Sequence, residues 1–212
     1  AGLAALLTER RSADVVAFRS HFAVNALSVT SGVATLDLIA GRPEVARVLG
    51  SKSVPVPDAV PTAAAGDPRA VEWNVGRVGA PAVWALGHTG EGVVVATIDT
   101  GVRHTHAAVV GAYRGNLGGG SFDHDFNWYD PAGTCGAAPC DNVDYGTGLT
   151  SVLVGDDGGA NQVGVAPGAR WITAKGCATS SCSDADLLAA ADWLLAPCPV
   201  GDEPGAAGCD PE

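Results

Sequence analysis

The most restrictive feature of this sequence is a run of β-branched and small residues that ends in a carboxylate. Residues 93–98 read Val-Val-Val-Ala-Thr-Ile, and Asp99-Thr100-Gly101 follows directly. A continuous apolar run of this kind is typical of a strand buried on both faces of a helix-covered parallel sheet. Ligands of open α/β sheets bind beyond the carboxyl ends of the strands, where Asp99 stands. Asp99 is therefore a candidate functional residue, and a carboxylate that caps the turn before Gly101 is the alternative.

The residues that follow continue an α/β pattern. Residues 171–174 predict a second buried strand. Residues 183–195 predict a helix that begins with Ser183 as its N-cap, carries acidic residues in its first turn and has Pro197 beyond its end. We therefore expect a parallel sheet with flanking helices over residues 71–212.

Two segments of different character precede this region. Residues 1–50 predict a small α+β unit, and residues 51–70 predict a linker rich in Pro and Ala. The elements expected in the first segment are a helix over the apolar residues of 3–18, a strand at 22–29, a helix at 33–40 and a short strand at 45–49.

Composition and charge exclude several classes of function. The formal net charge of −11 repels phosphate backbones, so we expect no nucleic-acid partner. Mean hydropathy is only +0.19, and no uninterrupted apolar span of about 18 residues occurs, so we expect no membrane partner. A charged content of 17% together with 29 Gly suits an extracellular enzyme with many turns.

The cysteines form a pattern of three close pairs. Six cysteines permit fifteen pairings, and we favour the three local bridges. Zinc ligation is the alternative, although the companion CxxC and HxxxH motifs are absent. Disulfides would place the chain in an oxidising compartment, so we expect a secreted protein. The expected pairs are Cys135 with Cys140, Cys177 with Cys182, and Cys198 with Cys209.

A series of motifs in one order resembles the subtilisin-like serine proteases, or subtilases. Trp73-Asn74, residues 80–84, Gly90-x-Gly92 and the Asp-Thr-Gly motif at 99–101 resemble the opening of a subtilase catalytic domain. Residues 113–116, 123–131, 154–177 and 186–197 resemble the bacillopeptidase F-like branch, and Asn25-Ala26 resembles a recurrent pair of its propeptide.

This resemblance implies a division into three parts with distinct roles. Residues 1–50 would be a partial inhibitory propeptide, 51–70 a linker and 71–212 the N-terminal half of the catalytic domain. The fold would be the first half of a subtilisin-like parallel sheet. The implied partners are protein or peptide substrates and the chain's own propeptide as an intramolecular inhibitor, as in a secreted zymogen.

The same resemblance implies a Ser-His-Asp endopeptidase, in which Asp99 is the carboxylate of the triad. The family's His-Gly-Thr-His motif aligns with residues 145–148, so Tyr145 occupies the position of the catalytic His. A phenol titrates near pH ~10, so Tyr145 is no efficient general base at neutral pH, although its hydroxyl is able to hydrogen-bond Asp99. Asp141 keeps a position that the family uses near the substrate-binding cleft.

The nucleophile of the family stands in a Gly-Thr-Ser motif, which these 212 residues do not contain. We expect the chain to stop before the oxyanion Asn and the nucleophilic Ser and to be catalytically incompetent as given. His104, His106 and His124 are interpreted as loop or surface residues and not as a relocated base. The alternative function is a peptide-binding pseudoprotease. A small-molecule α/β domain is disfavoured, because no glycine-rich phosphate loop follows the strand.

No metal or cofactor is expected. Subtilases often bind calcium through an Asp nine residues after the triad carboxylate, and Ala108 stands there. Asp123, Asp125 and Asp130, together with Asn127, offer oxygen ligands, but their spacing matches no EF-hand. We interpret this segment as a solvated acidic loop.

Overall fold

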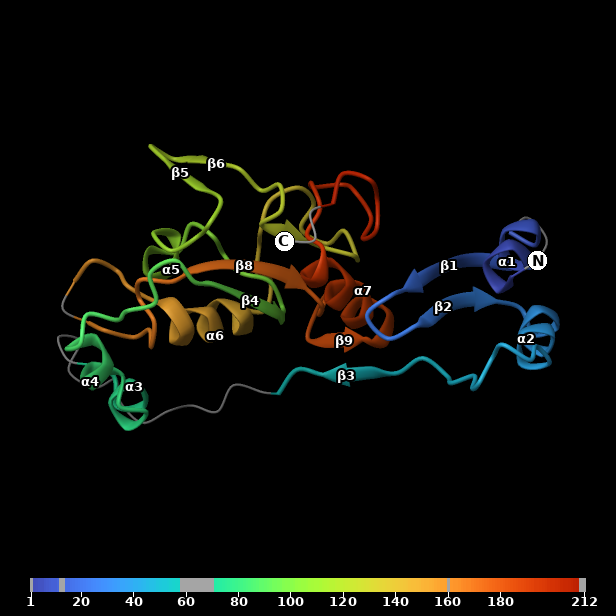
Figure 1. The fold of residues 1–212 in the computed structure, drawn as a ribbon, viewed down its shortest axis with the longest axis horizontal. Coiled ribbons are helices and arrows are strands. Elements are labelled where there is room, and N and C mark those ends of the chain that lie inside the picture. The colour runs from blue at the N-terminus through green and yellow to red at the C-terminus, as the bar shows by residue number, and fades with distance from the viewer. Residues whose placement is uncertain (1, 12–13, 58–70, 160, 210–212) are drawn as a thin grey trace. The chain divides into compact units, whose positions relative to one another are not determined.

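A computed structural model of the chain describes residues 2–11, 14–57, 71–159 and 161–209. The chain divides into a smaller unit, Ala1–Lys52, and a larger unit, Ser53–Glu212. The helices and strands of both units are labelled in Figure 1.

The smaller unit is a β-hairpin with both helices at its open end, one before the first strand and one after the second (Figure 1). The two strands pair antiparallel, from Val15 opposite Ser31 to His21 opposite Ala26. A small apolar core of Leu7, Val15 and Ile39 joins the strands to the helices. The elements are α1 (Leu3–Glu9), β1 (Val15–His21), β2 (Ala26–Ser31) and α2 (Val33–Ala40).

The helix predicted at 33–40 is confirmed as α2, but three other expectations for this unit are wrong. The helix expected over 3–18 ends at Glu9. Residues from Val15 onward form the strand β1 instead, because they hydrogen-bond to β2. The strand predicted at 22–29 begins only at Ala26, since Asn25 adopts a φ of 48° in the hairpin turn. Residues 45–49 form no strand and have no pairing partner in the described part of the chain.

The larger unit is built on a parallel sheet with the strand order β4-β8-β7. Strand β4 (Val94–Asp99) pairs with β8 (Arg170–Lys175) along its whole length, and Asp99 lies opposite Lys175 at the carboxyl end. The short β7 (Trp128–Tyr129) pairs with the other edge of β8. The predicted parallel sheet, including the strands expected at 93–98 and 171–174, is confirmed.

Helices and short strands surround this sheet (Figure 1). The predicted helix α7 (Asp184–Leu195) is confirmed with its cap, since Ser183 Oγ accepts a hydrogen bond of 3.0 Å from the Asp186 amide. The other helices are α3 (Trp73–Arg77), α4 (Ala80–Trp84), α5 (Ala107–Val110) and α6 (Tyr145–Val154). The short strands are β3 (Ser53–Pro55), β5 (Asn116–Gly118), β6 (Ser121–Phe122) and β9 (Ser181–Ser183).

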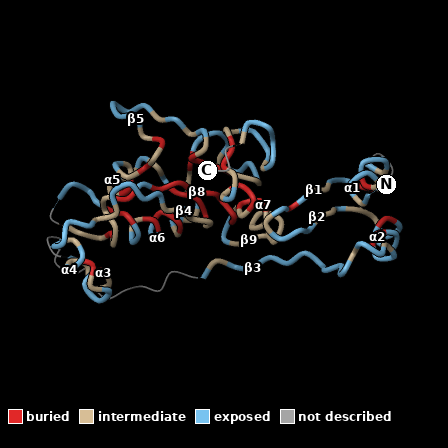
Figure 2. Tube along the Cα trace, in the orientation of Figure 1, coloured by how far each residue is buried: buried red, intermediate tan, exposed pale blue. Residues whose placement is uncertain are grey.

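Two apolar clusters form the core of the larger unit, and most of their residues belong to β8, the helices and the adjoining loops (Figure 2). Trp171 lies in one cluster beside Tyr113, with ring centroids 4.4 Å apart. Trp193 of α7 lies in the other cluster and stacks on Tyr129. These aromatic contacts hold the helices and loops against the sheet.

The expectation that β4 is buried on both faces is wrong. Val93 is 51% exposed and Val94 is 44% exposed. Among the described residues β4 pairs only with β8, so one of its edges carries no neighbouring strand to shield it. Exposure decreases toward the carboxyl end, where Thr100 is fully buried, so the candidate site lies at the better-covered end of the strand.

The six cysteines form the three local bridges, Cys135–Cys140, Cys177–Cys182 and Cys198–Cys209. None of the helices in the described part of the chain has the length and apolar character needed to cross a membrane. Of the predicted linker, residues 58–70 lie outside the described residues, and Ser53–Pro55 forms the strand β3.

Candidate active site

The carboxylate of Asp99 lies at the carboxyl end of β4, in the turn that leads away from the sheet. Its Oδ1 accepts a hydrogen bond of 2.6 Å from the Thr100 amide. Its main-chain carbonyl accepts another, of 3.1 Å, from the Cys177 amide just after β8. Burial raises the pKa of Asp99, and the charge of Asp141 acts in the same direction, against the hydrogen bonds from Thr100. The turn therefore holds Asp99 in a defined, partly desolvated position.

The first turn of α6 packs directly against the turn that follows Asp99. The Gly146 amide donates a hydrogen bond of 2.9 Å to Thr100 Oγ1. A Cβ atom at position 146 would lie 2.2 Å from the Gly101 carbonyl oxygen and 3.1 Å from Asp99 Oδ1. Only glycine fits this contact, so the helix start and the carboxylate are in van der Waals reach.

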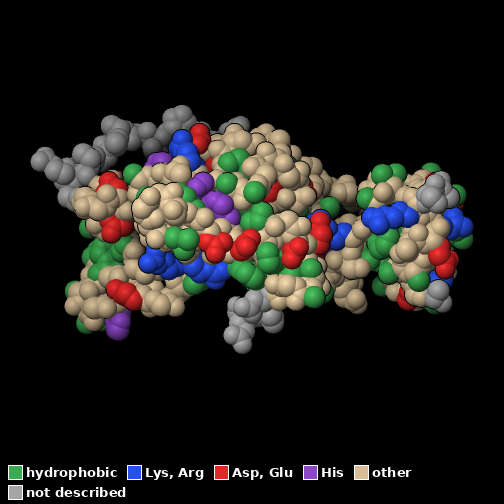
Figure 3. Space-filling view, turned by 90° about the horizontal axis from the view of Figure 1, so that it is seen from above, with side chains coloured by type: hydrophobic (Ala, Val, Ile, Leu, Met, Phe, Trp, Pro, Cys, Tyr) green, Lys and Arg blue, Asp and Glu red, His purple; other side chains and the backbone are tan. Residues whose placement is uncertain are grey.

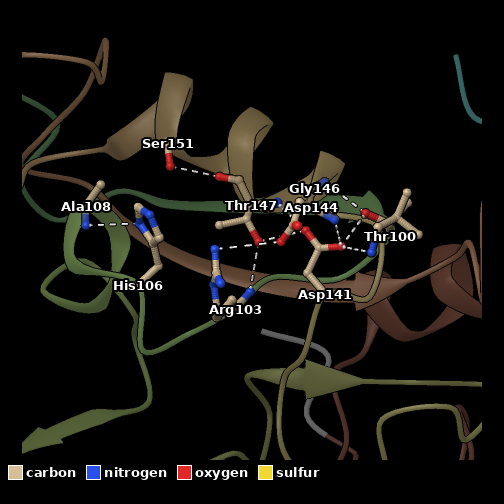
Figure 4. A network of polar contacts seen from close by, with 10 residues as sticks. Thr100, Arg103, His106, Ala108, Asp141, Asp144, Gly146, Thr147 and Ser151 are labelled. Carbon is tan, nitrogen blue, oxygen red and sulfur yellow. Dashed lines mark hydrogen bonds and ion pairs between the residues drawn. The ribbon is translucent and has the colours of Figure 1, made fainter. Parts of the chain in front are cut away.

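Asp141 ties the loop before α6 to both of these elements (Figure 4). Its Oδ1 accepts hydrogen bonds from Thr100 Oγ1 at 2.9 Å and from the amides of Val143 and Asp144. Its Oδ2 accepts from the amide and the hydroxyl of Thr147, at 2.8 and 2.7 Å. Burial acts to raise the pKa of Asp141, but these hydrogen bonds outweigh burial and hold the pKa below its ordinary value.

Tyr145 is the first residue of α6 and immediately precedes Gly146. Asp144, at the N-cap position, adopts a φ of 66°, so the chain turns sharply just before the helix. The Tyr145 side chain is half-buried, and its hydroxyl has no hydrogen-bond partner among the described residues. The structure thus brings Asp99, Asp141 and the start of α6 together, without the hydrogen bond to Asp99 that the Tyr145 hydroxyl is able to form.

The histidines form contacts of their own, away from Asp99. His104 and His124 lie with ring centroids 5.0 Å apart, and His124 Nδ1 is hydrogen-bonded to the Tyr113 hydroxyl at 2.9 Å. His104 Nδ1 donates to the Pro139 carbonyl, and His106 caps α5. Histidine side chains gather on one face of the larger unit in Figure 3. His104, His106 and His124 contact aromatic rings, a tyrosine hydroxyl, a carbonyl and a helix end.

Side-chain oxygens of the acidic loop at 123–130 accept hydrogen bonds from other parts of the larger unit. Asn127 Oδ1 accepts from Arg114 Nε at 2.6 Å, and Asp130 Oδ2 accepts from the Cys135 amide at 2.6 Å. Asp125 Oδ1 accepts from the Val200 amide at 2.8 Å. Within the residues that the structure describes, no group of three or more His, Cys, Asp or Glu side chains is arranged to hold a metal ion.

One charged residue of this region was not identified from the sequence. Lys175 ends β8 beside Asp99 and is 0% exposed. A usable signal was present: an ionisable residue ends each of two neighbouring apolar strands, and the carboxyl ends of parallel strands meet at one edge of the sheet.

A strand edge lies close in sequence to these residues. Strand β9 pairs antiparallel with β3, from Ser53 opposite Ser183 to Pro55 opposite Ser181. The pairing continues through the Val56 amide, which donates a hydrogen bond of 2.9 Å to the Ser180 carbonyl. The bridge Cys177–Cys182 connects this edge to the residue that binds the Asp99 carbonyl.

Comparison with known proteins agrees with this arrangement. Residues 90–205 match the model of the subtilase family, peptidase S8. Bacillopeptidase F of Bacillus subtilis (strain 168) is 37% identical over 203 residues, which cover 91% of this chain and 14% of that protein. The minor extracellular protease Vpr of the same organism is 35% identical over 99 residues, or 45% of this chain and 11% of Vpr. The chain thus spans only a small part of the length of these relatives. It belongs to the subtilase family.

Proposed function

We propose that the larger unit provides the carboxylate side of a subtilase active site, with Asp99 as the carboxylate of the triad. The observation that carries this proposal is the contact between Asp99 and the start of α6, where a Cβ atom on Gly146 would approach Asp99 Oδ1 to 3.1 Å. In a Ser-His-Asp triad the carboxylate orients the histidine and stabilises its positive charge. Position 145, where the family has its catalytic His, is the helix residue immediately before Gly146.

The tyrosine at position 145 leaves this geometry without the general base of a Ser-His-Asp triad. A phenol with an ordinary pKa near ~10 does not take a proton from a serine hydroxyl efficiently at neutral pH. We therefore expect the chain to hydrolyse no peptide bonds by itself. In subtilisin, loss of the catalytic His or Ser alone costs roughly 10⁶ in kcat.

Strand β9 is the proposed edge for peptide substrates, and β3 is the proposed inhibitory segment. Extended peptides commonly bind by adding a strand to an exposed sheet edge, where the main-chain hydrogen bonds give affinity. The antiparallel pairing of Ser53–Pro55 with Ser181–Ser183 supports this role, since it is the geometry of a bound peptide. While β3 is paired with β9, a peptide substrate would be unable to pair with the same edge.

Asp141 is proposed to serve the substrate cleft indirectly. Both of its carboxylate oxygens already accept hydrogen bonds from Thr100 and from residues at the start of α6. We expect Asp141 to fix the segment beside the cleft and not to bind substrate itself.

Secretion as a zymogen is the proposed setting. Three disulfide bridges support an oxidising compartment. The name of the relative Vpr describes it as an extracellular protease.

A peptide-binding experiment tests the proposal. Val56→Pro removes the amide that bonds the Ser180 carbonyl and should loosen β3 from β9. A fluorescent peptide with the sequence of residues 51–57 should then bind the variant at least about tenfold more tightly than the original chain, as expected for a released edge. Val48→Pro, in a segment without secondary structure, is the matched control and should leave binding unchanged.

Two results would contradict the proposal. Equal peptide affinity for both chains would remove the role of β9 as the substrate edge. Hydrolysis of labelled casein by the purified chain would refute the assignment of Tyr145 as an inactivating residue. Binding without hydrolysis would favour the second candidate function, a peptide-binding pseudoprotease, for which the replacement of both histidines of the motif by Tyr145 and Gly148 is the specific observation.

A further inference from the structure

The ammonium of Lys175 is a buried charged group at the carboxyl end of β8. Its residue is 0% exposed, although lysine is almost never fully buried unless it is paired. A buried charge costs free energy of folding unless hydrogen bonds and opposite charges compensate it. An apolar side chain of similar length would fill the same space at the end of β8 without that cost. The charge therefore calls for an explanation beyond packing.

The hydrogen bonds of Lys175 connect the two segments that meet at the proposed active site. Its Nζ donates to the Thr100 carbonyl, in the turn after Asp99. The same Nζ donates at 2.6 Å to Oδ1 of Asn142, in the loop that leads into α6. One ammonium thus joins the carboxylate turn to the approach of the helix that carries position 145.

The residues bound by Lys175 belong to the network around Asp99. Thr100 also bonds Asp141 and the Gly146 amide through its hydroxyl. A shift of the Thr100 turn would therefore move the start of α6 relative to Asp99. Burial lowers the pKa of Lys175, while the carboxylates of Asp130, Asp141 and Asp99 act to raise it, so the charge of Lys175 faces three acidic groups.

We propose that Lys175 is a positioning residue of this site: its ammonium joins the Thr100 carbonyl to the Asn142 side chain and so fixes Asp99 against the first turn of α6. The proposal rests on the proposed role of Asp99. It assigns Lys175 no contact with substrate. Its function is to keep two loops in one arrangement and to place a positive charge beside the Asp99 carboxylate.

The variant Lys175→Met tests this in the whole chain, because methionine keeps the length of the side chain and removes its charge. Lys52 is the only other lysine of the chain, so Lys52→Met is a matched control. We expect amide hydrogen exchange at Gly146 and Thr147 to become at least about tenfold faster, as for the loss of a hydrogen bond to a charged group. Exchange of the Trp171 amide, near the start of β8 and bonded to the Ala112 carbonyl, should change less than exchange of these two amides.

The pKa of Asp99 provides a second readout. A lysine that only filled space would not shift this pKa in a defined direction when it is replaced. Carboxyl ¹³C NMR should show an upward shift of the pKa of Asp99 in Lys175→Met, because the positive charge of Lys175 favours the ionised carboxylate. Unchanged exchange at Gly146 and Thr147, together with an unchanged Asp99 titration, would overturn the proposal. That result would leave the role of Asp99 itself untouched, since neither measurement depends on hydrolysis.

A milder pair of variants keeps the proposal testable if Lys175→Met does not fold. Asn142→Ala removes one acceptor of the ammonium, whereas Asn142→Asp retains an oxygen at that place. We expect faster exchange at Gly146 in Asn142→Ala and exchange close to that of the original chain in Asn142→Asp. Identical exchange in both variants would contradict the proposed link between Lys175 and the approach to α6.

Discussion

The two units of this chain bury apolar surface very differently. The smaller unit, Ala1–Lys52, has a core of three buried apolar side chains. The larger unit buries three tryptophans completely, or nearly so, in and around its sheet. The smaller unit also exposes many large apolar side chains, namely Val16, Phe22, Val24, Val33, Leu36, Leu38, Val48 and Leu49. Small domains bury a smaller fraction of their surface and are correspondingly marginal, so we expect the larger unit to be the more stable.

Cross-links and charged contacts reinforce this difference. All three disulfide bridges lie in the larger unit, where they restrict the unfolded chain. The buried ammonium of Lys175 and the carboxylate of Asp141 belong to the same unit. The proposed active site therefore lies in a unit that has its own core and its own cross-links.

The largest effect is expected from removing a buried tryptophan of the larger unit. Trp171→Ala should lower the free energy of unfolding by about 3–5 kcal/mol, because the indole is fully buried and donates a hydrogen bond to the Val109 carbonyl. Tryptophan fluorescence during urea unfolding measures this, since all five tryptophans lie in the larger unit. Trp73→Ala, at a position that is 79% exposed, should change stability by less than about 0.5 kcal/mol. Similar effects of the two substitutions would refute the described core.

A core substitution in the smaller unit should affect that unit alone. Leu7→Ala should cost about 2–5 kcal/mol, which is comparable to the whole stability that such a small core supplies. Methyl NMR separates the units, because Ile39 lies in the smaller unit and Ile98 and Ile172 lie in the larger. We expect the Ile39 signal to move to its unfolded position while the other two remain. Leu38→Ala, at a 44% exposed position, is the control, and loss of all three signals in Leu7→Ala would show that the units unfold together.

The sequence predicted best those elements whose causes are local. The strands β4 and β8 and the cap of α7 were predicted, because their signals act over a few residues. These signals are a β-branched run and a Ser immediately before an acidic first turn. The strand at Val15 was missed because it depends on pairing with β2 across a turn. Local spacing alone favoured a helix there.

The candidate site shows the same limit. Asp99, Asp141 and Tyr145 were singled out from motifs, and the structure brings their segments together. Lys175 was missed, because its partners Thr100 and Asn142 lie 75 and 33 residues away in sequence. The ionisable residue at the end of each apolar strand indicated only that the two strand ends could meet, and it did not identify these two partners. The exposure of Val94 was missed for a related reason, since burial depends on which strands lie beside β4.

A smaller effect is expected where α6 touches the Asp99 turn. Gly146→Ala places a methyl group 2.2 Å from the Gly101 carbonyl oxygen and should destabilise the larger unit by about 1–3 kcal/mol. Gly148→Ala, two residues along the same helix, meets no atom within 4 Å and should stabilise the helix by up to about 1 kcal/mol. Urea unfolding followed by tryptophan fluorescence measures both. The Ile39 signal of the smaller unit should not respond to either, and equal effects of the two substitutions would contradict the close contact.

The smallest effect concerns the pH dependence of the two carboxylates. The pKa of Asp99 is raised by burial, so its contribution to stability is present below the unfolded value near 3.8 and is lost as the pH rises through the folded pKa. The pKa of Asp141 is lowered by hydrogen bonds that outweigh its burial, so its contribution is present above the unfolded value and is lost as the pH falls through the folded pKa. The two groups thus oppose each other within one site.

Asparagine substitutions separate these opposite contributions. At pH ~7 Asp99→Asn should stabilise the larger unit by up to about 1 kcal/mol, after allowance for solvent screening, and Asp141→Asn should destabilise it. Both differences should shrink when unfolding is measured near pH ~3, where the carboxylates of the unfolded chain are protonated. In the smaller unit, Asp14→Asn is the comparison, because hydrogen bonds from Thr35 lower the pKa of Asp14, which is partly buried. If Asp99→Asn destabilised the larger unit equally at both pH values, the cost of burying the ionised Asp99 would be refuted, and Asp99 would be only a hydrogen-bonding residue of its turn.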